Sequence, residues 1–98
     1  MKLPRHPRTD HLFHAILALK DIEECYEFFE NACTIRELEE ISQRFEIAQL
    51  LWLGKSYNEI NHMTGASTAT ICRVKKCLVD ENSGYQLTLK RLSQEDLK

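Results

Sequence analysis

Apolar residues recur every three or four positions along most of this chain, which is the spacing of amphipathic α-helices. The longest such pattern runs from about Thr34 to Leu53 and ends at Gly54. Its apolar positions are Ile35, Leu38, Ile41, Phe45, Ala48 and Leu51 or Trp52. Three glycines and two prolines, both prolines before residue 8, leave few breaks. The pattern therefore predicts an all-α fold of about six helices.

Helix-capping residues indicate where these helices begin. The expected starts are, in chain order, near Asp10, after Asp21, after Thr34, after Ser56, after Ser67 or Thr68, and near Tyr85. Thr34 with Glu37, and Ser56 with Glu59, have the spacing of capping boxes, in which each side chain bonds the backbone N–H of the other residue.

A chain of 98 residues allows one domain. Residues 1–9 are basic, contain both prolines and lack periodicity, so we interpret them as a flexible arm before a helical domain at 10–97. Apolar residues in the first two expected helices cover more than one side of each helix, which indicates burial on several sides. In so short a chain we expect the covering partner to be a second copy, giving a homodimer.

Charge is unevenly distributed along the chain, although the formal net charge is only −2. The segment from Asp21 to Glu46 contains nine acidic residues and only two arginines, whereas Ser67 to Leu78 contains three basic residues and no acidic residue. A local basic helix on an acidic body suits a protein that contacts a polyanion at one surface. Chance clustering on a solvated face is the alternative.

Residues 56–79 have the pattern of a helix-turn-helix, whose second helix enters the major groove of DNA. Gly65 supplies the turn, and Ile71, Val74 and Leu78 supply the stripe that docks the second helix. Small and basic residues occupy its other positions, where they can approach base edges and phosphates. The candidate DNA-contacting residues are Ser67, Thr68, Ala69, Thr70, Cys72, Arg73 and Lys76.

The run from Gly65 to Arg73, GASTATICR, resembles the recognition segment of the tryptophan repressor superfamily. The stretches 21–54 and 65–78 are similar to its YerC/YecD branch, and the resemblance covers most of residues 10–92. It implies an intertwined, all-helical homodimer that binds double-stranded operator DNA. We therefore expect a transcriptional regulator, in the role of a repressor. A replication-initiator type of DNA-binding domain without a regulatory ligand, or a helical dimeric protein-interaction module, is the alternative.

The resemblance also implies a candidate effector pocket. The tryptophan repressor holds its ligand between two arginines, with help from a threonine, a serine and a glycine that leaves room for the indole. The matching positions here are Thr34, Arg44, Arg73, Val74 and Cys77. Valine in place of glycine, and cysteine in place of serine, argue against L-tryptophan, so the effector is unidentified. The favoured interpretation is that both arginines pair with glutamates or with phosphate.

Other chemistry has little support in the sequence. The cysteines form no CxxC pair, and His11 with His14 lack an accompanying carboxylate–histidine motif, so we expect no metal site and no cofactor. No nucleophile–base arrangement or glycine-rich phosphate loop is present, so we expect no enzyme. No apolar run exceeds five residues, so we expect no membrane span and a cytoplasmic location.

Overall fold

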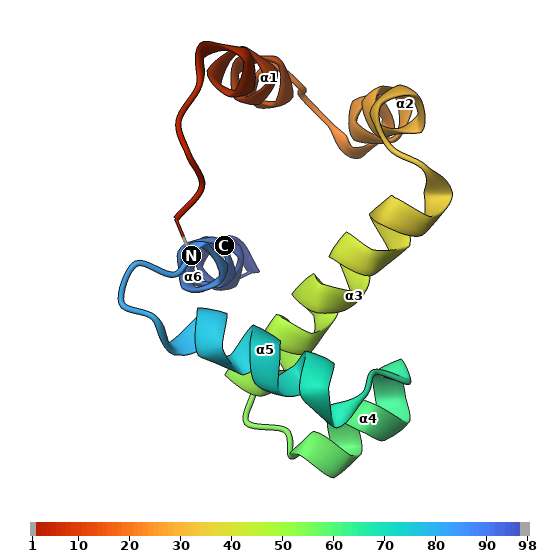
Figure 1. Cartoon of the computed structure of the whole chain (residues 1–98), viewed down its shortest axis with the longest axis vertical. Coiled ribbons are helices and arrows are strands. Elements are labelled where there is room, and N and C mark those ends of the chain that lie inside the picture. The colour runs from red at the N-terminus through yellow and green to blue at the C-terminus, as the bar shows by residue number, and fades with distance from the viewer. Residues whose placement is uncertain (1, 97–98) are drawn as a thin grey trace. The chain divides into compact units, whose positions relative to one another are not determined.

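The computed structural model describes residues 2–96, with side chains described up to residue 93, and within that range it contains six helices and no strand. The helices are α1 Pro7–Leu17, α2 Ile22–Ala32, α3 Ile35–Trp52, α4 Tyr57–Thr64, α5 Thr68–Val79 and α6 Gly84–Asp96 (Figure 1). The prediction of an all-α fold of about six helices is thereby confirmed. The chain divides into two compact units, Met1–Leu38 and Glu39–Lys98, so the boundary falls near the start of α3.

In the first unit, α1 begins earlier than the sequence suggested. His6 caps the helix, its Nδ1 accepting a 3.0 Å hydrogen bond from the Arg8 N–H, and Pro7 occupies the first turn. Proline suits this position because its φ is already helical and its missing N–H would have no partner there. The expected flexible arm at residues 1–9 is therefore wrong for residues 7–9, which are helical. Residues 1 and 97, at the outer ends of the expected arm and domain, lie outside the described residues.

The second helix, α2, begins at its expected cap. The Asp21 carboxylate accepts from the Glu24 N–H at 2.9 Å, and the Glu24 carboxylate accepts from the Lys20 N–H at 2.9 Å. No residue of α1 or α2 is buried, and large apolar side chains on both helices are exposed. Those exposed by more than two fifths are Leu12, Phe13, Leu17, Ile22 and Tyr26. These helices therefore carry apolar surface that the described chain leaves open to solvent.

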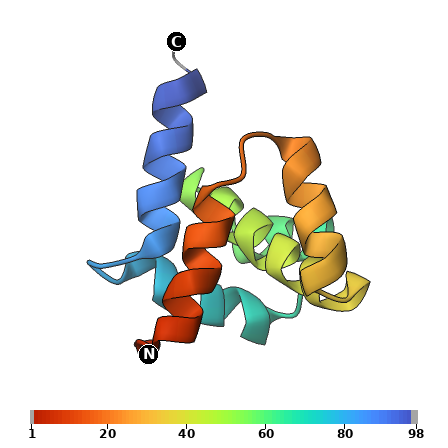
Figure 2. The ribbon, with the colours of Figure 1, turned by 90° about the horizontal axis from the view of Figure 1, so that it is seen from above.

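The second unit holds the hydrophobic core. Its buried residues come from α3, α4, α5 and α6 and from the turn before α5: Ile47, Ala48, Leu51, Ile60, Ala66, Ile71, Val74, Leu78 and Leu89. The stripe that was expected to dock α5, formed by Ile71, Val74 and Leu78, is buried in this core. Figure 2 shows α6 leaving the loop after α5 as one straight helix. The core fixes α5 against α3, α4 and α6 and leaves the other side of α5, with Thr68, Ala69 and Arg73, exposed.

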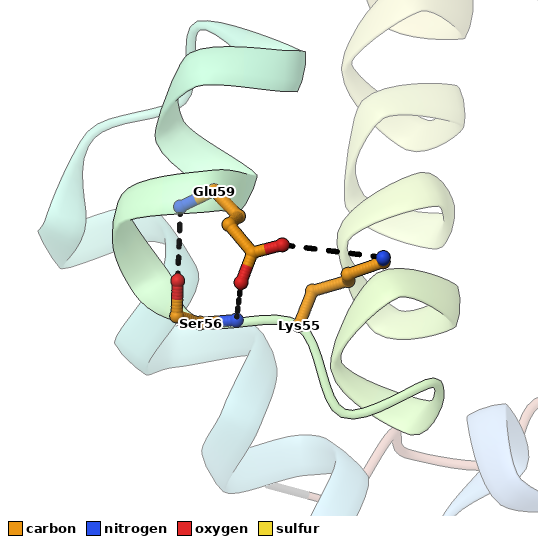
Figure 3. Close-up of polar contacts among 3 residues, drawn as sticks. All are labelled: Lys55, Ser56 and Glu59. Carbon is orange, nitrogen blue, oxygen red and sulfur yellow. Dashed lines mark hydrogen bonds and ion pairs between the residues drawn. The ribbon is translucent and has the colours of Figure 1, made fainter.

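Both predicted capping boxes are present. The Ser56 hydroxyl accepts from the Glu59 N–H at 3.1 Å, and the Glu59 carboxylate accepts from the Ser56 N–H at 3.2 Å (Figure 3). The corresponding distances for Thr34 and Glu37 are 3.1 and 2.9 Å. These backbone N–H groups, followed by the two hydroxyls, lower the pKa of each glutamate, and Lys55 adds to the effect at Glu59. Each box satisfies helix N–H groups that would otherwise lack a partner.

Candidate DNA interface and ligand pocket

The turn between α4 and α5 depends on Gly65. Its φ is +74°, in the left-handed region, and its N–H donates to the Asn61 carbonyl at 2.8 Å. A side chain would meet no neighbouring atom here, but an L residue would be strained by the backbone angle alone. Gly65 therefore allows α4 to end and the chain to reverse into α5 within three residues, 65–67.

The first turn of α5 combines a cap with small exposed side chains. The Ser67 hydroxyl accepts from the Thr70 N–H at 3.2 Å and lies 3.1 Å from the Thr70 hydroxyl. Ser67, Thr68 and Ala69 are exposed, whereas Thr70 is half-buried. Thr68 and Ala69 are thus the residues of this turn that can reach a ligand without giving up a helix cap.

Further along α5, the cationic side chains are accessible and the thiol is less so. Arg73, Lys75 and Lys76 are exposed, but Cys72 is half-buried beside Tyr57 of α4. Partial burial of Tyr57, followed by its interaction with the Cys72 thiol, raises the pKa of the phenol. Tyr57 also packs against the core, so it serves packing within the motif. Of the seven candidate DNA-contacting residues, Thr70 and Cys72 offer the least surface.

Four of the five candidate effector residues line one open pocket of about 420 Å³ in the second unit. They are Arg44 on α3 and Arg73, Val74 and Cys77 on α5. The other lining residues are Glu40, Gln43, Thr70 and Tyr85, which were not among the candidate effector residues. The fifth candidate, Thr34, belongs to the first unit, where its hydroxyl is part of the α3 capping box.

The two arginines of the pocket have different surroundings. Arg44 Nη2 lies 3.9 Å from Glu40 Oε2, one turn earlier on α3, so this arginine has a glutamate partner. Arg73 forms no ion pair within the described part of the chain. Its charge is therefore available for an external anion.

Val74 lies at the boundary between the pocket and the core. It lines the pocket, yet only 3% of its surface is exposed because its side chain packs in the core cluster. Displacing its side chain from this cluster would leave a void in the core, which is costly. The core packing of Val74 therefore sets the shape of the pocket wall at this position of α5.

His11, His14 and the four cysteines are the residues with metal-binding side chains that the sequence singled out. His11 and His14 are exposed, and the described residues contain no group of three or more potential metal ligands. All four cysteines are free thiols. No helix within residues 2–96 has the length and apolarity needed to cross a membrane.

Comparison with known proteins agrees with this geometry. Residues 8–93 match the Trp repressor protein family. The chain belongs to this family. It is 48% identical over 92 residues to a Bacillus subtilis protein named "Uncharacterized protein YerC", covering 94% of this chain and 88% of the relative. This supports the resemblance to the YerC branch.

Two solved structures of Trp repressor relatives have the same fold. A putative Trp repressor from Staphylococcus aureus is 44% identical with a TM-score of 0.86, covering 91% of this chain and 89% of that one. A TrpR-like protein from Eubacterium eligens is 47% identical with a TM-score of 0.87, covering 91% and 92%. Membership of the Trp repressor family indicates a helix-turn-helix DNA-binding regulator, and α4 and α5, joined by the turn at Gly65, are the pair that the sequence predicts as this motif.

Proposed function

We propose that this chain is a sequence-specific transcriptional regulator, and specifically a repressor, that binds double-stranded DNA with α5 in the major groove. The observation that carries the proposal is the exposed face of α5. It begins with the small residues Thr68 and Ala69, continues with Arg73 and Lys76, and has no acidic residue. The membership of the Trp repressor family supports the same role.

Each part of this face suits a different contact. Thr68 and Ala69 are short enough for the helix backbone to approach base edges, and their methyl groups suit the thymine methyl. Arg73 and Lys76 provide the positive charge that phosphates attract, as does the exposed Lys75. Base contacts at the start of α5 would then specify sequence, and the cations would position the helix on the backbone.

The proposal includes a homodimer in the cytoplasm. Leu12, Phe13, Leu17, Ile22 and Tyr26 are exposed on two helices that contain no buried residue. A second copy would cover such apolar surface and would present two α5 helices to successive major grooves. The preferred site should then be a palindrome with half-site centres about 10–10.5 base pairs apart.

Selection of bound sequences from random duplex DNA, followed by titration at several salt concentrations, tests this function. We expect a palindromic site and an affinity that falls steeply with salt. The double variant Arg73→Ala/Lys76→Ala should lose most binding, whereas Lys90→Ala, which removes an exposed cation from α6, should lose little. Absence of any enriched sequence, together with weak, salt-insensitive binding, would overturn the proposal. Salt-insensitive capture of an amphipathic helix would favour the protein-interaction module instead.

A further inference from the structure

The turn of the helix-turn-helix is held by three polar side chains. The Thr64 carbonyl accepts from Gln43 Nε2 at 3.1 Å, and the Ala66 carbonyl accepts from Asn61 Nδ2 at 2.6 Å. The Ala66 N–H donates to the Thr64 hydroxyl at 3.1 Å, and that hydroxyl donates to the Ile60 carbonyl at 2.7 Å. The three side chains are those of Gln43, Asn61 and Thr64.

Gln43 differs from the other two members because it comes from outside the motif. Asn61 and Thr64 belong to α4, so their bonds hold the turn to the helix that precedes it. Gln43 lies on α3, 21 residues earlier, and its bond joins the turn to the scaffold. The orientation of its amide is determined, because a carbonyl can only accept and must therefore face the NH₂ group.

The acceptor of this bond is one that a helix leaves unsatisfied. Thr64 is the last residue of α4, and the last four carbonyls of a helix have no intrahelical donor. Both Gln43 and Thr64 are half-buried, so water replaces the bond poorly when it is lost. Loss of the Gln43 donor would free the end of α4 to shift, and α5 begins only four residues further on, at Thr68.

We propose that Gln43 is a positioning residue for DNA recognition, which fixes the orientation of α5 relative to the scaffold by holding the Thr64 carbonyl. This inference rests on the proposed function. Gln43 itself need not touch DNA. Base readout requires side chains such as Thr68 to meet base edges with correct hydrogen-bond geometry, whereas phosphate attraction tolerates small shifts of the helix. A loosened turn should therefore impair recognition of the preferred sequence more than it impairs general attraction to DNA.

The test compares the affinity for the selected duplex with the affinity for a scrambled duplex, at one salt concentration. Gln43→Met keeps the side-chain length but removes the donor, and Gln43→Glu keeps the shape but only accepts. In both variants the ratio of scrambled to preferred dissociation constants should fall by about threefold to tenfold, the size of one hydrogen bond. Gln43→Lys, which restores a donor, should recover most of the ratio. Gln49→Met, at an exposed position later on α3, is the matched control and should leave the ratio unchanged.

A second measurement separates positioning from stability. Hydrogen exchange of the Gly65 and Ala66 N–H groups in DNA-free protein should speed up in Gln43→Met while core amides of α5 keep their protection. An unchanged ratio in Gln43→Met and Gln43→Glu, or unfolding of all three Gln43 variants, would overturn the inference and leave the proposed function intact. A wild-type protein with no preferred duplex would overturn the proposed function, and the role of Gln43 with it.

Discussion

Glu40 and Arg44 lie one turn apart on α3, and a carboxylate oxygen of Glu40 is 3.9 Å from a guanidinium nitrogen of Arg44 in the lining of the pocket. Both side chains are roughly half exposed, so the pair adds little to stability. The pair instead affects the binding of anionic ligands, because a carboxylate that approaches Arg44 also meets the negative charge of Glu40.

We predict from this arrangement that L-tryptophan is not a corepressor of this protein. Its carboxylate would compete with Glu40 for Arg44, and the resemblance to the tryptophan repressor implies that its indole would need the space that Val74 occupies. Val74 is packed in the core, and overpacking a fitted site costs about 1–3 kcal/mol, or roughly a 5- to 150-fold loss of affinity. Calorimetric titration should show no saturable heat at millimolar L-tryptophan, and DNA binding should not change with the ligand.

The variant Val74→Gly allows the binding of L-tryptophan to be compared with and without the valine side chain, once the folded fraction of the variant has been measured. It reopens space against α5 but also removes a buried side chain from the core. Saturable binding of L-tryptophan to the wild-type protein would contradict the prediction and would show that the helix moves to admit the ring.

Stability should depend on pH through the capping box of α4. The pKa of Glu59 is lowered, first by the Ser56 N–H, then by its hydroxyl and by Lys55. A carboxylate whose pKa is lowered by folding increases the free energy of unfolding. This contribution is fully present above the ordinary Glu pKa of about 4.3 and is lost as the pH falls through the lower pKa of the folded state. Urea unfolding should therefore show Glu59→Gln less stable than wild type at pH 7, with a difference that shrinks in acid.

Glu46→Gln is the control, since it removes an exposed carboxylate that belongs to no capping box. If Glu59→Gln and Glu46→Gln gave the same difference from wild type at every pH, the capping box would not be the source of the effect.

The oligomeric state provides a third prediction. The protein should sediment as a dimer at micromolar concentration, because α1 and α2 expose apolar side chains that a partner copy would bury. Leu17 is 79% exposed, and we expect a charge at this position to weaken the dimer. Leu17→Glu should raise the dimer dissociation constant at least about tenfold, since burying an unpaired carboxylate is costly. Lys20→Gln, a nearby exposed change, should have little effect. A folded wild-type monomer at micromolar protein would contradict this prediction.

Local rules of sequence predicted much of the second unit. The cap at Ser56, the turn at Gly65 and the buried stripe of Ile71 and Val74 each depend on residues within one helix turn of one another, so the chain itself reveals them. The start of α1 at Pro7 also follows a local rule, since proline favours the first helical turn. His6 is not a usual cap, however, and the capping residues of the sequence placed the start near Asp10 instead.

Contacts between distant residues were not readable in the same way. Glu40 could have been found, because it lies four residues before Arg44, the spacing of an ion pair on a helix. The bond from Gln43 to Thr64 joins two helices, and Cys72 is half-buried beside Tyr57 of another helix; no local pattern encodes either contact. Helical periodicity places Cys72 away from the docking stripe but does not identify what covers it.

The final prediction separates charge from sequence readout on α5. Lys76→Ala should weaken binding to every duplex alike and should reduce the salt slope by about one unit per protomer, since one phosphate contact is lost. Thr68→Ala should instead cost about 1–3 kcal/mol on the preferred site alone, because it removes a base contact and no charge. Titrations of preferred and scrambled duplexes at three or more salt concentrations, with Lys90→Ala on α6 as the control, distinguish the two effects. If Lys76→Ala and Thr68→Ala both left affinity and preference unchanged, α5 would not be the helix in the groove, and the DNA-binding surface would have to lie elsewhere on the protein.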